Sequence, residues 1–237
     1  MKGGKLVGGV WLPDTETHFA EWMTESKRAR EIDGKLTYQH HKITKAMDLQ
    51  PVDRRRVCVD IGAHAALWSM WLVDEFDELI AFEPVPLHAD LFDLNMEGKS
   101  YELHRMALGN APGTVGIEIP PDMTGNAHVA VAGAARHPGG KYSEIKHWPI
   151  VENVEIRTLD SFDLTDVDFI KIDVEGFELP VVQGAEETIC RCKPHMVVEQ
   201  KGNESAYGGA KNEAAEFLYA LGMKDLTIMA GDHIMGW

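Results

Sequence analysis

The sequence predicts an α/β domain, with a mostly parallel sheet, helices on both faces of that sheet and an antiparallel strand pair at the C-terminus. Three apolar strand candidates alternate with helical segments between residues 57 and 108, which is typical of a parallel sheet. These strands carry few polar positions, as expected for strands that are covered on both faces. The last two segments, Met223–Met229 and His233–Trp237, are separated by a short turn and predict the antiparallel pair.

The first half of the chain contains the clearest alternation of strands and helices. Residues 1–50 are polar and mixed, and we expect them to form a helical lead with a helix at Tyr38–Leu49. Residues 51–237 are expected to form a Rossmann-like core, so that the whole chain makes a single domain. The expected core elements up to residue 108 are strands at Val57–Ile61, Leu79–Phe82 and Tyr101–Leu108, and helices at Ala65–Phe76 and His88–Met96.

A stretch rich in glycine, alanine and histidine interrupts this alternation near residues 120–148. Long loops in compact domains are either disordered or functional, so we expect this insert to influence the choice of substrate. The alternation then resumes, and a last helix is predicted to end at Gly222. The expected elements around and after the insert are strands at Thr114–Ile119, Val154–Leu159, Val167–Asp173 and His195–Glu199, and a helix at Glu178–Ile189.

Composition and charge exclude several classes of protein. The 237 residues are 44% hydrophobic and 26% charged, which is ordinary globular composition. Because 23 basic residues face 38 acidic ones, the formal charge is −15. Such a charge argues against nucleic acid as a bulk partner and against docking on an anionic membrane.

Targeting signals and cysteines point to the cytoplasm. No apolar run approaches the roughly 20 residues that span a bilayer, and the first residues lack the apolar region of a signal peptide. Three cysteines, Cys58, Cys190 and Cys192, do not make a disulfide framework and predict a reducing compartment. No spacing of cysteine or histidine is strong enough to predict a metal site.

Two consecutive core strands end in residues that suit a nucleoside. Asp60 is followed by Gly62, whose lack of a side chain lets the backbone approach a ligand closely. Glu83 ends the next strand, where a carboxylate can accept hydrogen bonds from ribose hydroxyls. An acid at a strand end also commonly caps a helix, but the two sites together favour a nucleoside-binding half.

The turn after the first strand distinguishes between nucleosides. A nicotinamide or flavin site needs the pattern G-x-G-x-x-G, because a pyrophosphate lies on the helix N-terminus. Here the segment Gly62–Leu67 contains one glycine, and His64 crowds the turn. A ligand without a pyrophosphate fits better, and S-adenosylmethionine is the common ribonucleoside of that kind.

A third group of polar residues follows a later strand. Lys171, Asp173 and Glu175 share a side-chain parity, so they project the same way if the strand persists. Burying three ionised groups is costly unless they are paired or face a polar cavity. A lysine–aspartate ion pair that merely closes the strand end is one explanation, and a cluster that lines a reaction cleft is the other.

Taken together, these motifs resemble the FkbM-type S-adenosylmethionine-dependent methyltransferases. The resemblance runs in family order over roughly residues 57–201. It implies a Rossmann-like class I methyltransferase fold and an enzyme that mostly methylates hydroxyl oxygens of small molecules or glycans. One residue departs from the family, which usually has glycine where Ala66 stands. The matching segments are VDIGAH at Val59–His64, AFEPVP at Ala81–Pro86, ALGN at Ala107–Asn110, TLDSF at Thr158–Phe162, DFIKIDVEGFEL at Asp168–Leu179, QGAEETI at Gln183–Ile189 and VVEQK at Val197–Lys201.

The resemblance also implies roles for individual residues around the cofactor. The methionine end of S-adenosylmethionine would lie over the glycine turn, and Glu83 would hold the ribose hydroxyls. Asp173 would lie nearest the sulfonium and would face the methyl group together with Glu175. The residues implied at the glycine turn are Asp60, Gly62, Ala63 and His64, and those implied beside the adenine are Pro84, Val85, Met106 and Ala107.

The chemistry of methyl transfer adds further candidates. A hydroxyl is a poor nucleophile, so a base that removes its proton helps the reaction, and Glu175 or Glu199 is the candidate base. Lys171 would hold these carboxylates ionised by proximity. The resemblance, rather than the chemistry, implies Asn126 as the candidate contact to the acceptor, because such families often reach into the cleft at this position. Two alternatives stay open: a nicotinamide-dependent oxidoreductase of Rossmann type, and a cofactor-binding protein without catalysis.

Overall fold

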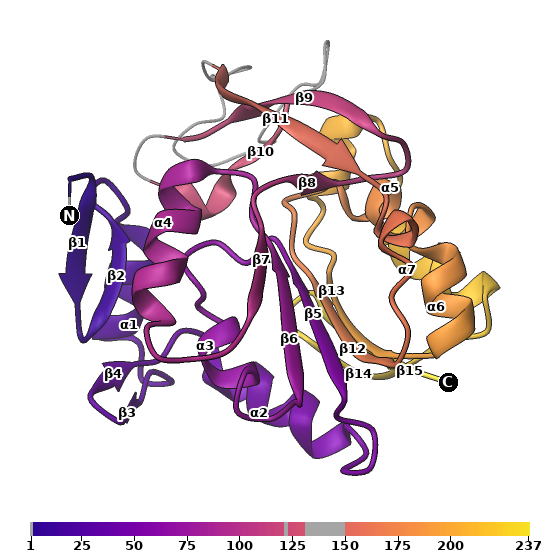
Figure 1. The fold of residues 1–237 in the computed structure, drawn as a ribbon, viewed down its shortest axis with the longest axis horizontal. Coiled ribbons are helices and arrows are strands. Elements are labelled where there is room, and N and C mark those ends of the chain that lie inside the picture. The colour runs from indigo at the N-terminus through magenta and orange to yellow at the C-terminus, as the bar shows by residue number, and fades with distance from the viewer. Residues whose placement is uncertain (1, 121–122, 131–149) are drawn as a thin grey trace.

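The core of the protein is a seven-stranded sheet (Figure 1). The computed structural model describes residues 2–120, 123–130 and 150–237. The strand order is β14-β15-β13-β12-β5-β6-β7, and β15 alone runs against its neighbours. This confirms the predicted α/β fold with its C-terminal antiparallel strands. The strands are β5 (Val57–Ile61), β6 (Glu78–Phe82), β7 (Glu102–His104), β12 (Val167–Ile172), β13 (His195–Glu199), β14 (Lys224–Met229) and β15 (Asp232–Gly236).

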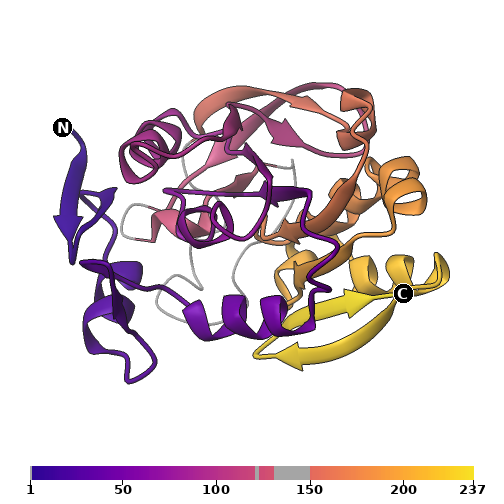
Figure 2. The same cartoon turned by 60° about the horizontal axis from the view of Figure 1, so that its bottom comes forward.

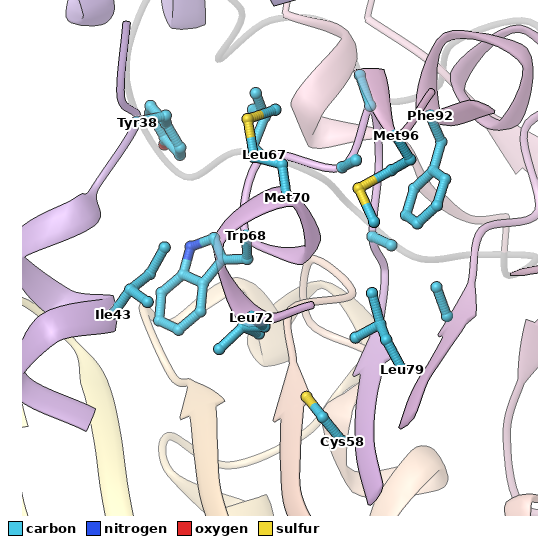
Figure 3. Packing of buried hydrophobic residues seen from close by; sticks show 14 of the residues in the cluster. Tyr38, Ile43, Cys58, Leu67, Trp68, Met70, Leu72, Leu79, Phe92 and Met96 are labelled. Carbon is cyan, nitrogen blue, oxygen red and sulfur yellow. The ribbon is translucent and has the colours of Figure 1, made fainter. Parts of the chain in front are cut away.

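Helices cover both faces of this sheet because its strands alternate their buried side chains. Cys58 of β5 faces the cluster built with α2, α3 and α4, whereas Val57 and Val59 face the cluster built with α5, α6 and α7. In the first cluster, Ile43 of α2 lies beside Trp68 (Figure 3). The helices are α1 (His18–Glu25), α2 (His40–Leu49), α3 (Ser69–Leu72), α4 (Pro86–Asn95), α5 (Glu178–Gln183), α6 (Glu186–Cys192) and α7 (Glu213–Ala220), with 3₁₀ helices at Thr124–Asn126, Leu159–Phe162 and Asn203–Tyr207.

A second, four-stranded sheet lies across the carboxyl ends of the core strands (Figure 1). Its order is β10-β9-β11-β8, and its apolar side chains form a third cluster that includes Val85 and Ala107. This second sheet therefore covers the edge of the main sheet at which ligands bind in parallel α/β folds. Its strands are β8 (Ala107–Leu108), β9 (Gly113–Glu118), β10 (His128–Val129) and β11 (Ile150–Arg157).

The N-terminal segment contains two hairpins that the sequence does not predict. The hairpin of β1 (Gly4–Val7) and β2 (Val10–Pro13) lies at the opposite end of the molecule from β14 and β15 (Figure 2). A smaller hairpin joins β3 (Glu31–Ile32) to β4 (Lys35–Leu36). Two-residue strands such as these leave little trace of alternation in a sequence.

Three predicted elements are broken in the structure, each for a local reason. The helix expected at 65–76 is reduced to α3, because His64 and Ala66 adopt left-handed backbone angles with φ of 49° and 65°. A glycine at position 66 would adopt this angle without strain. The helix expected at 178–189 divides into α5 and α6 at Gly184, where a side chain would lie 1.9 Å from the carbonyl oxygen of Gly109. The strand expected at 101–108 divides between the two sheets as β7 and β8.

Candidate functional site

Two adjoining cavities lie where the strand order of the main sheet reverses. Strands β5 and β12 are neighbours in the sheet, but the chain leaves them in opposite directions across it. The space in the first cavity, which is open to solvent, is about 590 Å³ and that in the second, also open, is about 760 Å³. Both cavities are lined by Gly62, His64, Gly125 and Asp173. A crevice at such a reversal is the usual ligand site of an open α/β sheet.

Gly62 lies at the junction of the two cavities, where the backbone leaves no room for a side chain. Its φ is +75°, and a Cβ atom placed on it would lie 1.9 Å from the carbonyl oxygen of Asp173. Any side chain here would therefore push the ends of β5 and β12 apart. The close approach of the two strand ends therefore requires glycine at this position.

The first cavity holds a carboxylate at the end of β6. Glu83 is buried and accepts hydrogen bonds from the backbone nitrogens of His64 and Val85, both at 2.8 Å. A carboxylate can accept about four hydrogen bonds, so it retains capacity for two hydroxyl groups. Apolar walls surround it, from Ile61, Phe82, Pro84, Val85, Met106, Ala107, Leu108, Ile117, Val129, Val174 and Phe177.

Two histidines whose rings are in contact, tilted by 43° to each other, form one side of the first cavity. The rings of His64 and His88 lie 3.9 Å apart between their centroids, and Nδ1 of His88 lies 3.5 Å from Oε1 of Glu83. Burial, reinforced by His88 and then Lys171, holds the pKa of His64 well below its usual range. His64 is therefore a neutral imidazole at physiological pH.

Three carboxyl groups converge in the second cavity. Single oxygens of Asp173, Glu175 and Glu199 all lie within 4.8 Å of one another. Burial and the neighbouring carboxylates raise the pKa of Glu199 to about 8 and that of Glu175 well above its usual range. Glu175 and Glu199 therefore retain protons near neutral pH, and the oxygen atoms of the cluster are also of the kind that could hold a divalent cation.

Polar neighbours hold two of these three groups in place. Asn203 donates a hydrogen bond of 2.7 Å to Oε2 of Glu175, and Lys201 donates to Glu199. Glu175 has a φ of +56°, so the strand does not continue through it as the parity argument assumed. Its side chain nonetheless lines the same cavity as Lys171 and Asp173.

Lys171 and Asp60 form a buried ion pair behind the cavities. The ammonium group lies 3.2 Å from Oδ1 of Asp60 and donates to the carbonyl oxygen of Gly62 at 2.8 Å. Although burial alone would lower the pKa of Lys171, Asp60 and Asp173 hold it above its usual value. Asp60 also accepts a hydrogen bond of 2.6 Å from Ser69. The pair thus fixes the turn at Gly62.

Aromatic side chains from the N-terminal segment complete the second cavity. His18, Phe19 and Tyr38 line it together with Leu67 and Trp68. Burial, followed by the charge of Asp173, raises the pKa of Tyr38, so its hydroxyl stays protonated. These residues lie far from the core motifs in sequence.

The structure brings the predicted site residues together, with one exception. Each of them lines at least one of the two cavities except Asp60. Asp60 is fully buried and is not among the described residues that line either cavity. Sequence reasoning missed Lys201 and Asn203, which also line the second cavity. They follow Glu199 at every second position past the end of β13, and this spacing is the signal that could have found them. Of the insert near 120–148, Asn126 lines the second cavity, whereas residues 121–122 and 131–149 lie outside the described part of the chain.

A helix suited to crossing a membrane would need to be long and continuously apolar. None of the helices in the described ranges is both.

Comparison with known proteins gives consistent results. The chain is 23% identical over 201 residues to Methyltransferase 1 of Beauveria bassiana (strain ARSEF 2860), covering 77% of this chain and 80% of that protein. It is 23% identical over 194 residues to Methyltransferase sdnD of Sordaria araneosa, covering 71% and 75%. The crystal structure of Methyltransferase FkbM from Methylobacillus flagellatus KT aligns with a TM-score of 0.46 and 16% identity, over 77% of this chain and 43% of that longer one.

The family assignment follows from a match that spans most of the chain. The model of the FkbM methyltransferase domain matches residues 60–225, from the end of β5 to the start of β14. This range includes the glycine turn, Glu83 and all three carboxyl groups of the second cavity. The protein therefore belongs to the FkbM methyltransferase family.

Proposed function

We propose that the protein transfers a methyl group from S-adenosylmethionine to a hydroxyl oxygen of an uncharged small molecule or glycan. One observation carries this proposal. A cavity suited to a nucleoside opens, at Gly62 and Asp173, onto a second cavity that holds a cluster of carboxyl groups. The family membership supports methyl transfer as the reaction.

The residues of the first cavity fit an adenosine moiety. Glu83 has free acceptor capacity for the two ribose hydroxyls, since only two backbone donors reach it from the described residues. Val85, Met106 and Ala107 provide apolar surface for an adenine ring. Gly62 lines both cavities, so the turn that it forms offers bare backbone to the methionine end.

The second cavity provides the groups that a hydroxyl acceptor needs. S-adenosylmethionine supplies an electrophilic methyl group on a positively charged sulfur. Asp173 lies at the junction of the cavities, where its negative charge stabilises that positive charge. Glu199 accepts the proton of the acceptor hydroxyl, because a carboxylate with a pKa of about 8 is a far stronger base than an ordinary one. Glu175 and Asn203 orient the acceptor beside it.

The charge of the second cavity favours an acceptor without negative charge. Lys201 is already bound to Glu199, and Lys171 is bound to Asp60. Both lysines among the described residues of this cavity are therefore already paired with acids. A carboxylate or phosphate on the acceptor would face the carboxyl groups without a lysine to neutralise its charge. Tyr38, Phe19 and Trp68 offer apolar surface for the remainder of the molecule.

The proposal is tested by incubating the protein with methyl-labelled S-adenosylmethionine and a panel of neutral glycans and alcohols, carboxylic acids and amines. We expect label to appear on oxygen of a neutral acceptor. Asp173→Asn should lower the turnover of that acceptor at least about 100-fold while S-adenosylhomocysteine still binds. Turnover by Asp173→Asn at nearly the unchanged rate, or label on amine nitrogen alone, would contradict the assignment.

A further inference from the structure

Glu16 is a buried carboxylate that ties the N-terminal segment to the wall of both cavities. It is fully buried and accepts three hydrogen bonds. One oxygen accepts from the backbone nitrogen of Phe19 at 2.9 Å. The other accepts from the hydroxyl of Thr124 at 2.7 Å and from the backbone nitrogen of Gly125 at 3.2 Å. Gly125 lines both cavities, so Glu16 fixes a turn that borders the site.

The hydroxyl of Thr124 connects Glu16 to His64. A hydroxyl group has a single hydrogen, which Thr124 donates to the carboxylate of Glu16. The oxygen of Thr124 lies 3.3 Å from Nε2 of His64, and towards this ring it can only accept. Nε2 of His64 must therefore carry the hydrogen of the neutral imidazole.

This tautomer leaves Nδ1 of His64 as a bare acceptor. The ring is about nine-tenths buried, and among the described residues Nδ1 has no hydrogen-bond partner. The ammonium group of Lys171, whose charge acts on His64, is directed at Gly62 and Asp60 instead. A buried acceptor without a partner is uncommon in folded proteins, and this one belongs to a residue that lines both cavities.

From this network we propose that Glu16 is a positioning residue, which acts through Thr124 to fix the Nε2-protonated tautomer of His64. In that tautomer, Nδ1 accepts a hydrogen bond from the α-ammonium group of the cofactor, whose binding displaces the groups that shield this atom from solvent in the present structure. The inference rests on the proposed use of S-adenosylmethionine. The ammonium group is the donor at the methionine end, which the glycine turn before His64 is expected to receive.

The tautomer can be measured in the unaltered protein. Nitrogen-15 NMR separates protonated from unprotonated imidazole nitrogens, and the signals of His64 are those that disappear in His64→Asn. We expect a protonated Nε2 and an unprotonated Nδ1. Glu16→Ala frees the hydroxyl of Thr124 to donate, so this variant should give a mixture of tautomers. A protonated Nδ1 in the unaltered protein overturns the proposal.

Binding by paired variants tests the consequence for the ligand. Thr124→Val removes the hydroxyl and should weaken binding of S-adenosylhomocysteine at least about tenfold, while Thr124→Ser keeps the hydroxyl and should leave affinity within about twofold. Methylthioadenosine lacks the ammonium group, so its affinity should be equal in all three proteins. An equal loss for both ligands in Thr124→Val contradicts the ammonium contact.

These outcomes are distinct from failure of the proposed function. If the unaltered protein binds neither S-adenosylhomocysteine nor methylthioadenosine, the proposed cofactor is wrong. If it binds both, and Thr124→Val binds S-adenosylhomocysteine as tightly as the unaltered protein does, only the role of Glu16 and Thr124 is wrong.

Discussion

At the scale of single residues, the pKa of Glu199 links the geometry of the site to a measurable rate. Asp173 raises it after burial has done so, whereas Lys201 lowers it, and the result is about 8. A base acts only when it is deprotonated. The rate of methyl transfer should therefore rise with pH up to about 8 and level off above it.

Replacing Glu199, the base proposed above, gives a direct prediction. Glu199→Gln should lower kcat about 10²–10⁴-fold, because general-base catalysis contributes about this much. The affinity for S-adenosylhomocysteine should stay within about threefold. Glu186→Gln, at an exposed position on α6, is the matched control and should behave like the unaltered enzyme. An unchanged kcat in Glu199→Gln would contradict this role, because another group would then accept the proton of the acceptor hydroxyl.

The backbone at Gly62 gives a second prediction at this scale. Gly62→Ala should abolish measurable binding of S-adenosylhomocysteine and lower the free energy of unfolding by more than about 2 kcal/mol, because the new methyl group meets Asp173. Gly98→Ala is the control, since Gly98 has a similar φ of +81° but no atom within 4 Å of the added Cβ. It should cost only about 1 kcal/mol and leave binding intact. Calorimetry and urea denaturation measure both quantities.

Some site residues could be predicted from the sequence and others could not. The difference lies in how far along the chain the residues that they contact are. Gly62, Glu83 and Asp173 end core strands, and parallel strands present their ends at one edge, so sequence pattern was enough to group them. Glu16 and Tyr38 reach the site through contacts with residues far away in sequence. Such contacts have no periodic signal, and the polar lead therefore gave no hint of them.

At the scale of elements, one side chain fastens the N-terminal hairpin to the core. Asn95, at the end of α4, accepts a hydrogen bond from the backbone nitrogen of Trp11 and donates to the carbonyl oxygens of Trp11 and Ala65. It thereby connects β2 to the turn that follows Gly62. Asn95 is buried, so no solvent replaces these contacts when they are lost.

Removing this side chain should loosen one element before the rest. Asn95→Ala should lower the free energy of unfolding by about 2–4 kcal/mol, since buried backbone groups lose their partners. Hydrogen exchange should accelerate in β1, β2 and the turn at residues 63–66, while β5 and β12 stay protected. Asn110→Ala, at an exposed position, should change stability by less than about 0.5 kcal/mol. Uniform acceleration across the chain would contradict this attachment.

The elements themselves were predictable where their burial is simple. Strands β5, β12 and β13 are buried runs, and the sequence placed them to within one or two residues. The length of the helix after β5 was overestimated, because apolar spacing does not predict the left-handed backbone angle at Ala66. Propensity and pattern describe local preference, and the tertiary structure overrides both here.

At the scale of the whole molecule, buried acids make stability depend on pH. Burial raises the pKa of Glu178 to about 7, and the pKa values of Glu175, Glu199 and Asp232 are raised as well. Groups with a raised pKa stabilise the fold fully below their unfolded values, and this contribution is lost as pH rises through the folded ones. His64 has a lowered pKa, so its contribution is already complete above about 6.5.

The free energy of unfolding should therefore fall between pH 7 and pH 8.5. Urea denaturation at the two pH values measures the change, and Glu199→Gln should show a smaller fall because one titrating group is gone. A stability that rises over this interval would show that these acids are not protonated in the folded protein.

Part of the formal charge of −15 is concentrated at one place in the folded protein. The sequence alone used it to exclude bulk nucleic acid as a partner. The structure gathers Asp60, Asp173, Glu175 and Glu199 at the reversal point of the sheet, where only Lys171 and Lys201 accompany them among the described residues that line the second cavity. A cofactor with a positively charged sulfur suits this setting.

The central claim is that the first cavity receives S-adenosylmethionine, and isothermal titration calorimetry tests it most directly. The protein should bind S-adenosylhomocysteine with one site per chain, should bind it more weakly after Glu83→Gln, and should show no binding of NADH. Binding of NADH without binding of S-adenosylhomocysteine would contradict the account.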